Sequence, residues 1–266
     1  MGKAELIRRY IVFFVGISIG AFGVTLVTRS TLGVNSVACA SYVTSVYFPV
    51  TMGQVNIAFN LFMLISQLVI MTKAQRRAQW VMVLMQIPAF VVFGLLLDFF
   101  MFLTRDYHPG EYGYWAEFLT LIAGTIIIAI NICMQVAGGV TKLSCDAFVV
   151  VLAERIHRNI GTIKIIYDWT LVATAAVMSL VCSGFTEIVG IREGTLIGAF
   201  FVGYLVKLLY PHFKFCERWI LRAHKEKHVP EAFDSTLTPS AATEQKEQAP
   251  AVATVAYESQ QPSERK

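Results

Sequence analysis

Long, uninterrupted apolar blocks are the feature that most constrains how this chain can fold. Full-length blocks cover residues 10–28, 55–71, 80–103, 118–136, 163–182 and 194–210. A bilayer core about 30 Å thick requires about 20 mostly apolar residues per helix, and hydrocarbon cannot hydrogen-bond to an exposed backbone. Charged residues make up only 15% of the chain, against about a quarter in soluble domains. The sequence therefore predicts an all-α integral membrane protein.

Two shorter apolar segments, residues 35–48 and 144–156, interrupt the series of long blocks. Each follows a polar or glycine-containing break, at residues 29–33 and 138–142. Both are too short to cross a bilayer as straight helices. We therefore expect six transmembrane helices plus two short half-spanning helices, with each half of the chain ordered long, short, long, long.

The distribution of Lys and Arg distinguishes this arrangement from one with eight spans. Basic residues near helix ends favour the cytoplasm. With six spans, the basic residues at 3–9, 73–77, 142–164 and beyond 211 all face the cytoplasm, and Arg29, Arg105 and Arg192 lie outside. With eight spans, the patch at 73–77 would lie outside. We therefore predict six spans in an inner (plasma) membrane, with both termini cytoplasmic.

The two halves also match at a constant offset of 108 residues. The matched pairs are Gly16 with Gly124, Ser36 with Ser144, Gly53 with Gly161, and Asn60 with Asp168. Because each half has three spans, the second half must insert upside down. We therefore predict two inverted three-span repeats, residues 1–103 and 115–211, joined by an extracytoplasmic loop at 104–114. Such repeats with interrupted helices are typical of secondary transporters, and the two breaks point to a central site.

The C-terminal region divides into two parts. Residues 212–228 mix aromatic and aliphatic residues with Lys and Arg, which is typical of a basic amphipathic helix lying on anionic lipid. Residues 229–266 are rich in Ser, Thr, Pro, Ala, Gln and Glu, and we expect a disordered cytoplasmic tail.

A set of short motifs, in a fixed order, links the chain to a known group of proteins. The motifs are residues 20–24 with Leu32-Gly33, residues 48–53, Gln86-Ile87-Pro88 with Phe93-Gly94 and Asp98, Gly161 with Lys164 and Asp168, and residues 190–195 with Val202-Gly203. Their order resembles the YczE/YyaS/YitT-type bacterial integral membrane proteins over about residues 7–210. Members often carry Ser-Pro after the Leu-Gly, where this chain has Val34-Asn35-Ser36-Val37. The resemblance implies a bacterial cell membrane and several spans, and it supplies no established substrate or catalytic residues.

Polar residues at matched depth are the first candidates for a substrate pathway. Asp168 lies inside its apolar block, and its repeat partner Asn60 lies at the matching depth. A charge in the membrane costs about 2.5–3.5 kcal/mol on insertion scales. The two residues either coordinate an ion, proton or polar solute across the pseudo-twofold axis or hold helices together by hydrogen bonds. Ser36 and Ser144, which lie near the starts of the two short segments, are included as pathway candidates.

Five further residues complete the candidate pathway, each with an alternative structural role. Asp146 lies in the first turn of the second short segment and either stabilises that helix end or binds a cation or proton. Asn131 and Gln135 are four residues apart on one helix face, which either lines a cavity or joins helices. Arg192-Glu193 is either a solvated loop pair or a gate.

No sequence motif indicates nucleotide, metal or nucleophilic chemistry. The chain has no P-loop, GxSxG, HExxH or CxxC pattern, so we predict no cofactor, no catalytic or metal site, and no nucleic-acid partner. We predict a secondary transporter or channel-like permease for a small solute, driven by an ion or proton gradient. The alternative is a non-catalytic membrane partner or substrate-binding subunit of a larger complex. The bilayer is the expected partner, and a homo-oligomer remains compatible with the pattern.

Overall fold

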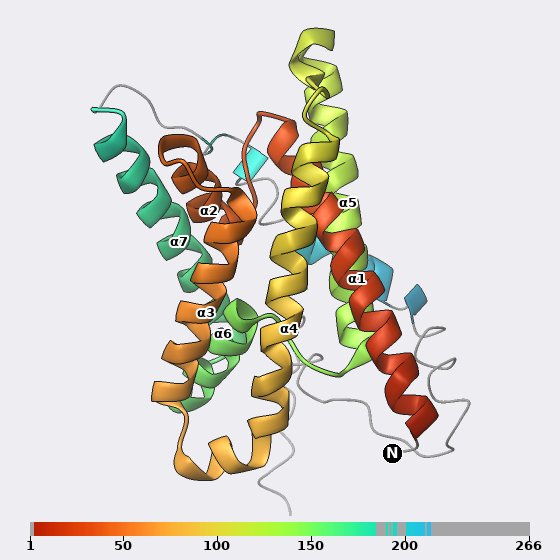
Figure 1. Ribbon diagram of the computed structural model, residues 1–266, viewed down its shortest axis with the longest axis vertical. Coiled ribbons are helices and arrows are strands. Elements are labelled where there is room, and N and C mark those ends of the chain that lie inside the picture. Colours follow the sequence, from red (N-terminus) through yellow and green to blue (C-terminus); the bar gives the residue numbers. More distant parts are fainter. Residues whose placement is uncertain are drawn as a thin grey trace, which may run out of the picture. The chain divides into compact units, whose positions relative to one another are not determined.

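The computed structural model describes residues 3–184, 190, 192, 194–195, 201–210 and 212–213. Its elements are α1 (Lys3–Arg29), α2 (Ser36–Tyr47), α3 (Met52–Ile70), α4 (Lys73–Leu103), the 3₁₀ helix η1 (Pro109–Tyr112), α5 (Tyr114–Gly138), α6 (Ser144–Arg155) and α7 (Ile160–Cys182) (Figure 1). No strand occurs in these ranges. The predicted all-α class is confirmed.

Five of these helices, α1, α3, α4, α5 and α7, are long and apolar enough to cross a membrane. Large apolar side chains also face outward; the Val69 and Val177 side chains, for example, are 73% and 62% exposed. Water would oppose so much exposed apolar surface, whereas lipid tails accept it. The protein is therefore a multi-pass membrane protein whose outer surface contacts the bilayer.

The remaining predicted segments are described only in part. Of the expected sixth span at 194–210, the structure describes 194–195 and 201–210, both of them helical. The predicted surface helix at 212–228 is described only at 212–213. The predicted tail at 229–266 lies outside the described residues.

The two short segments form helices of 12 residues each, α2 and α6, close to their expected bounds. The start of α4, however, differs from the expectation. The basic patch belongs to the helix, which begins at Lys73 rather than at residue 80. The Thr72 hydroxyl accepts from the Gln75 amide, while the Gln75 side chain accepts from the Thr72 amide, forming a capping box. Hydropathy marks the membrane-embedded part of a helix, but the cap determines where the helix starts.

Helices α1 and α5 run side by side in close contact (Figure 1). Small residues make this approach feasible, as they do in many membrane helix pairs. A Cβ atom added at Gly23 of α1 would lie 3.1 Å from the Gly124 carbonyl oxygen. A Cβ atom added at Gly124 of α5 would lie 2.9 Å from the Gly23 carbonyl oxygen. The two backbones therefore touch directly at these glycines.

Each short helix packs against a long helix from the other half of the chain. Helix α2 contacts α7, and α6 contacts α3. A left-handed residue lies just before each short helix: Thr31 has φ 60° and Gly139 has φ 58°. A left-handed residue at this position ends the preceding helix and redirects the chain. These turns allow α2 and α6 to leave the axes of α1 and α5 and enter the opposite half.

The start of α3 is held by an acidic residue from α4. The Asp98 carboxylate accepts from the Gly53 amide at 2.7 Å and from the Thr51 hydroxyl at 2.6 Å. An acid at a helix N-terminus satisfies unpaired amides and complements the helix dipole. Asp98 therefore joins α3 to α4.

Candidate functional site

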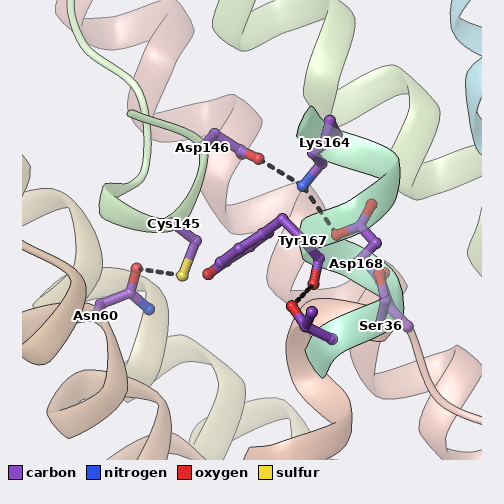
Figure 2. A network of polar contacts seen from close by, with 9 residues as sticks. Ser36, Asn60, Cys145, Asp146, Lys164, Tyr167 and Asp168 are labelled. Atoms are coloured by element: carbon purple, nitrogen blue, oxygen red, sulfur yellow. Dashed lines mark hydrogen bonds and ion pairs between the residues drawn. The ribbon is translucent and has the colours of Figure 1, made fainter. Parts of the chain in front are cut away.

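A lysine shared between two aspartates forms the centre of the candidate site. The Lys164 ammonium lies 2.9 Å from an Asp146 carboxylate oxygen and 3.2 Å from an Asp168 carboxylate oxygen (Figure 2). Lys164 and Asp168 belong to α7, whereas Asp146 belongs to α6. The Lys164 side chain therefore joins the short helix α6 to the long helix α7.

Local helix geometry explains how the sequence assembles this cluster. Lys164 and Asp168 are four residues apart, so they lie on one face of α7. The Asn159 side chain caps α7 by accepting from the Gly161 amide at 2.8 Å. Asp146 lies in the first turn of α6, which faces that side of α7. At about 1.5 Å per residue, Asp168 lies about 12 Å along α7 from its first residue, well inside the apolar block.

The first turn of the other short helix borders the same cluster. Ser36 is the first residue of α2, and its side chain lies next to the Asp168 carboxylate (Figure 2). The first residues of both short helices, which come from different halves of the chain, therefore meet around Lys164 and Asp168. Helix N-termini carry unpaired amides and partial positive charge, which makes such a junction a favourable place for polar groups.

A neutral hydrogen-bonding group adjoins the charged one. The Cys145 thiol donates to the Asn60 side-chain oxygen at 3.3 Å, and the Asn60 amide nitrogen lies 3.0 Å from both oxygens of Asn56. The Tyr167 ring projects from α7 between this group and the ion pairs, with its hydroxyl pointing toward Cys145 (Figure 2). Asn60 and Asp168 thus lie on either side of Tyr167.

Side-chain exposure decreases across the charged group. The exposed fraction is 46% for Asp146, 33% for Lys164 and 22% for Asp168. Asp146 is therefore the most accessible member of the cluster, and Asp168 is the most enclosed. Charges this enclosed within a membrane protein need partners or water, and Lys164 supplies the partner for both acids.

The other predicted pathway residues lie in three different places. The Gln135 side chain donates to Asn131 at 2.8 Å, and Asn131 packs against Gly20 at the α1–α5 contact, which favours its helix-joining role. Ser144, the first residue of α6, is fully buried. Arg192 donates to the Thr31 carbonyl at the first break. Glu193 lies outside the described residues.

Sequence reasoning missed Lys164 in the charged cluster and Asn56, Cys145 and Tyr167 beside it. The i, i+4 spacing of Lys164 and Asp168 could have identified Lys164, because an acid inside an apolar helix needs a partner or water, and a cation four residues away lies within reach. No sequence signal pointed to Cys145 or Tyr167, since both are ordinary constituents of apolar helices. Across the part of the chain that the structure describes, no group of three or more His, Cys, Asp or Glu side chains could hold a metal ion.

Comparison with protein families places the chain in a group defined by sequence. A family described as "Family of unknown function (DUF6198)" matches residues 7–211. The chain belongs to the DUF6198 family. The match covers α1 from residue 7 and all of α2 to α7, so the cluster around Lys164 lies within the DUF6198 region. No curated protein and no solved structure matches this DUF6198 protein.

Proposed function

We propose that this DUF6198 protein is a secondary transporter or channel-like permease for a small polar solute. The observation that carries the proposal is the Asp146–Lys164–Asp168 cluster, located where the first turns of α2 and α6 meet. Short helices that begin inside a membrane protein place unpaired backbone amides at depth, which is tolerated where they line a cavity or bind a solute.

The energetic cost of the cluster favours a functional role over a purely structural one. Each charged group in a membrane costs about 2.5–3.5 kcal/mol on insertion scales. Buried ion pairs recover little more than this cost, and apolar residues of similar volume are often at least as stabilising. Three charged side chains in α6 and α7 are therefore a poor means of holding the bundle together, whereas a polar pathway requires them.

Matched features at an offset of 108 residues support the inverted repeat in this proposal. Thr31 and Gly139, which share the left-handed conformation, are separated by this offset. The packing of α2 on α7 and of α6 on α3 is also what a twofold relation between the halves would produce. The pair Asn56 and Asn60 on α3 corresponds in the same way to Lys164 and Asp168 on α7. The two halves would thus contribute a neutral pair and a charged pair to one central site.

The resemblance to YczE/YyaS/YitT-type proteins leads us to propose a bacterial inner membrane, and the distribution of Lys and Arg leads us to propose that both termini are cytoplasmic. A reporter fused after Arg77, between α3 and most of α4, is expected to give a cytoplasmic signal. The reason is that Lys73, Arg76 and Arg77 follow the first pair of long helices and favour the inner face. Alkaline phosphatase and green fluorescent protein fusions at this position measure the side directly. High phosphatase activity there would rule out the six-span topology.

Transport itself is tested by untargeted metabolite profiling of bacterial cells that express the full chain. At least one small polar solute is expected to change in amount, inside the cells or in the medium. The Asp168→Asn variant should abolish that change, because it removes the enclosed charge from the cluster. Asp106→Asn is the matched control, since the Asp106 side chain is 88% exposed and pairs only with its neighbour Arg105 among described residues.

The comparison is made at equal membrane expression of the three proteins. Profiles that are the same for cells with the wild-type chain and with empty vector would argue against transport. A solute change retained in full by Asp168→Asn would remove this cluster from the pathway while leaving transport intact.

A further inference from the structure

We propose that Asp168 is a binding site for a single positive charge, a proton or a monovalent metal cation, which competes with Lys164 for its carboxylate. The proposal rests on the transport function above, for which it identifies the coupling ion site. Its test, however, measures binding to the purified protein and does not depend on any solute.

The two aspartates are satisfied unequally by the lysine between them. Lys164 donates a hydrogen bond to Asp146 at 2.9 Å. Its contact with Asp168, at 3.2 Å, is an ion pair without hydrogen-bond geometry. The Asp168 oxygen facing Lys164 is buried and accepts no hydrogen bond from any described residue. A buried anionic oxygen without a donor is unfavourable, and either a proton or a bound cation relieves this cost.

The charged groups around Asp168 come from two helices. Lys164 faces it from α7 and Asp146 from α6, while Lys142, in the loop before α6, acts on Asp146. Helix α2 contributes the uncharged Ser36 hydroxyl. Two carboxylates therefore share one ammonium group within hydrogen-bonding distance. Asp146 holds that ammonium more closely, so Asp168 is the acid left available to a second positive charge.

Binding at Asp168 would change which helices the cluster holds together. A proton taken from water would bond to the Asp168 carboxylate, and Lys164 would keep its own proton and its bond to Asp146. Lys164 would then pair with Asp146 alone and would still join α6 to α7. Neutral Asp168 could donate a hydrogen bond to the adjacent Ser36 hydroxyl on α2. A monovalent cation would have the same charge effect by coordinating the carboxylate. Either ion would thus couple occupancy of the site to the contacts that α7 makes with both short helices.

Infrared spectroscopy of the full chain in lipid nanodiscs tests whether Asp168 binds a proton. Lowering the pH from about 8 to about 6, a range in which ordinary Asp and Glu side chains stay ionised, should produce the carbonyl stretch of a protonated carboxylic acid in the wild-type chain. Asp168→Asn should remove this band, whereas Asp106→Asn should retain it. Asp168→Glu keeps a carboxyl group at the site and should also retain it, which guards against the possibility that Asp168→Asn simply fails to fold.

Thermal unfolding in sodium, potassium and choline salts at constant ionic strength tests whether Asp168 binds a monovalent metal cation. A rise in the unfolding midpoint in sodium or potassium relative to choline, lost in Asp168→Asn, identifies a metal cation as the ligand. If the wild-type chain gives neither signal, or if Asp168→Asn keeps in full whichever signal the wild type shows, the proposal is overturned. If Asp168 gives a binding signal but the protein moves no solute, transport is refuted and the ion site is supported. If the protein moves a solute but gives neither signal, the ion site is refuted and transport is supported.

Discussion

Lys164→Met is expected to lower the free energy of unfolding by about 2 kcal/mol. Removing one partner of a fully buried ion pair costs about 3–5 kcal/mol, because the remaining charge is left uncompensated. The Asp146 and Asp168 side chains are 46% and 22% exposed, so screening reduces the loss from the fully buried case. Lys164→Met also places two carboxylates near each other without the intervening cation. The thermal unfolding midpoint in a mild detergent measures the effect.

A charge-neutral variant separates this electrostatic effect from a packing effect. Combining Lys164→Met with Asp146→Asn and Asp168→Asn removes all three charges, so most of the lost stability should return. Arg105→Met is the matched control, because Arg105 is 65% exposed and its variant should unfold close to the wild-type midpoint. If Lys164→Met is as stable as the wild-type chain, the ion pairs do not contribute to the stability of the fold. If the triple variant stays as unstable as the single one, the loss is one of packing.

Gly124→Leu is expected to disrupt the α1–α5 pair and to cost about 3 kcal/mol or more. A Cβ atom at this position would lie 2.9 Å from both the Gly23 carbonyl oxygen and the Val27 backbone nitrogen. Overpacking usually costs about 1–3 kcal/mol when side chains can move aside. Here the Val27 side chain lies 2.7 Å away, but the other two opposing atoms belong to the backbone of α1, so the two helices themselves must separate. The yield of monodisperse protein and its thermal midpoint provide the measurement.

Gly203→Leu is the matched control for this substitution. Gly203 lies in the described helical segment 201–210, and an added Cβ would meet no atom of the described residues within 4 Å. The control should therefore fold with nearly wild-type yield, since both variants add the same side chain to a helix in an apolar environment. Equal yields from the two variants would mean that the close contact at Gly124 does not limit stability. The intermediate variant Gly124→Ala should lie between the wild type and Gly124→Leu.

Because Lys164 pairs with both acids, one residue underlies the stability of the cluster and its proposed ion binding. If Lys164 held both acids equally, neither acid would be the one whose charge can change. The hydrogen bond to Asp146 and the looser ion pair to Asp168 instead make Asp168 the member whose charge can change while α6 and α7 remain joined. The Lys164→Met experiment therefore tests how the cluster stabilises the fold, and the Asp168 measurements test whether the same cluster binds an ion.

Membrane insertion and the helix series could be read from the sequence. The long apolar blocks predicted the five described spans, and the two short helices lie near their predicted bounds. This success has a physical basis: the bilayer sets a minimum apolar length, and hydrocarbon forces backbone groups to pair within each helix. Helix ends outside the apolar region were harder to predict from the sequence, as the capping box at Thr72 shows.

The composition of the site was decided by tertiary packing. The sequence identified Asp146 and Asp168 as costly charges, but it did not show that both pair with Lys164 or that Cys145 and Tyr167 lie between Asp168 and Asn60. Those contacts depend on α6 crossing to α3 and α2 crossing to α7, which the left-handed turns at Thr31 and Gly139 make feasible. Hydropathy records which segments enter the membrane because that preference is local. Which helix faces meet is decided by packing between residues distant in sequence, so the cluster becomes visible only once the helices are placed together.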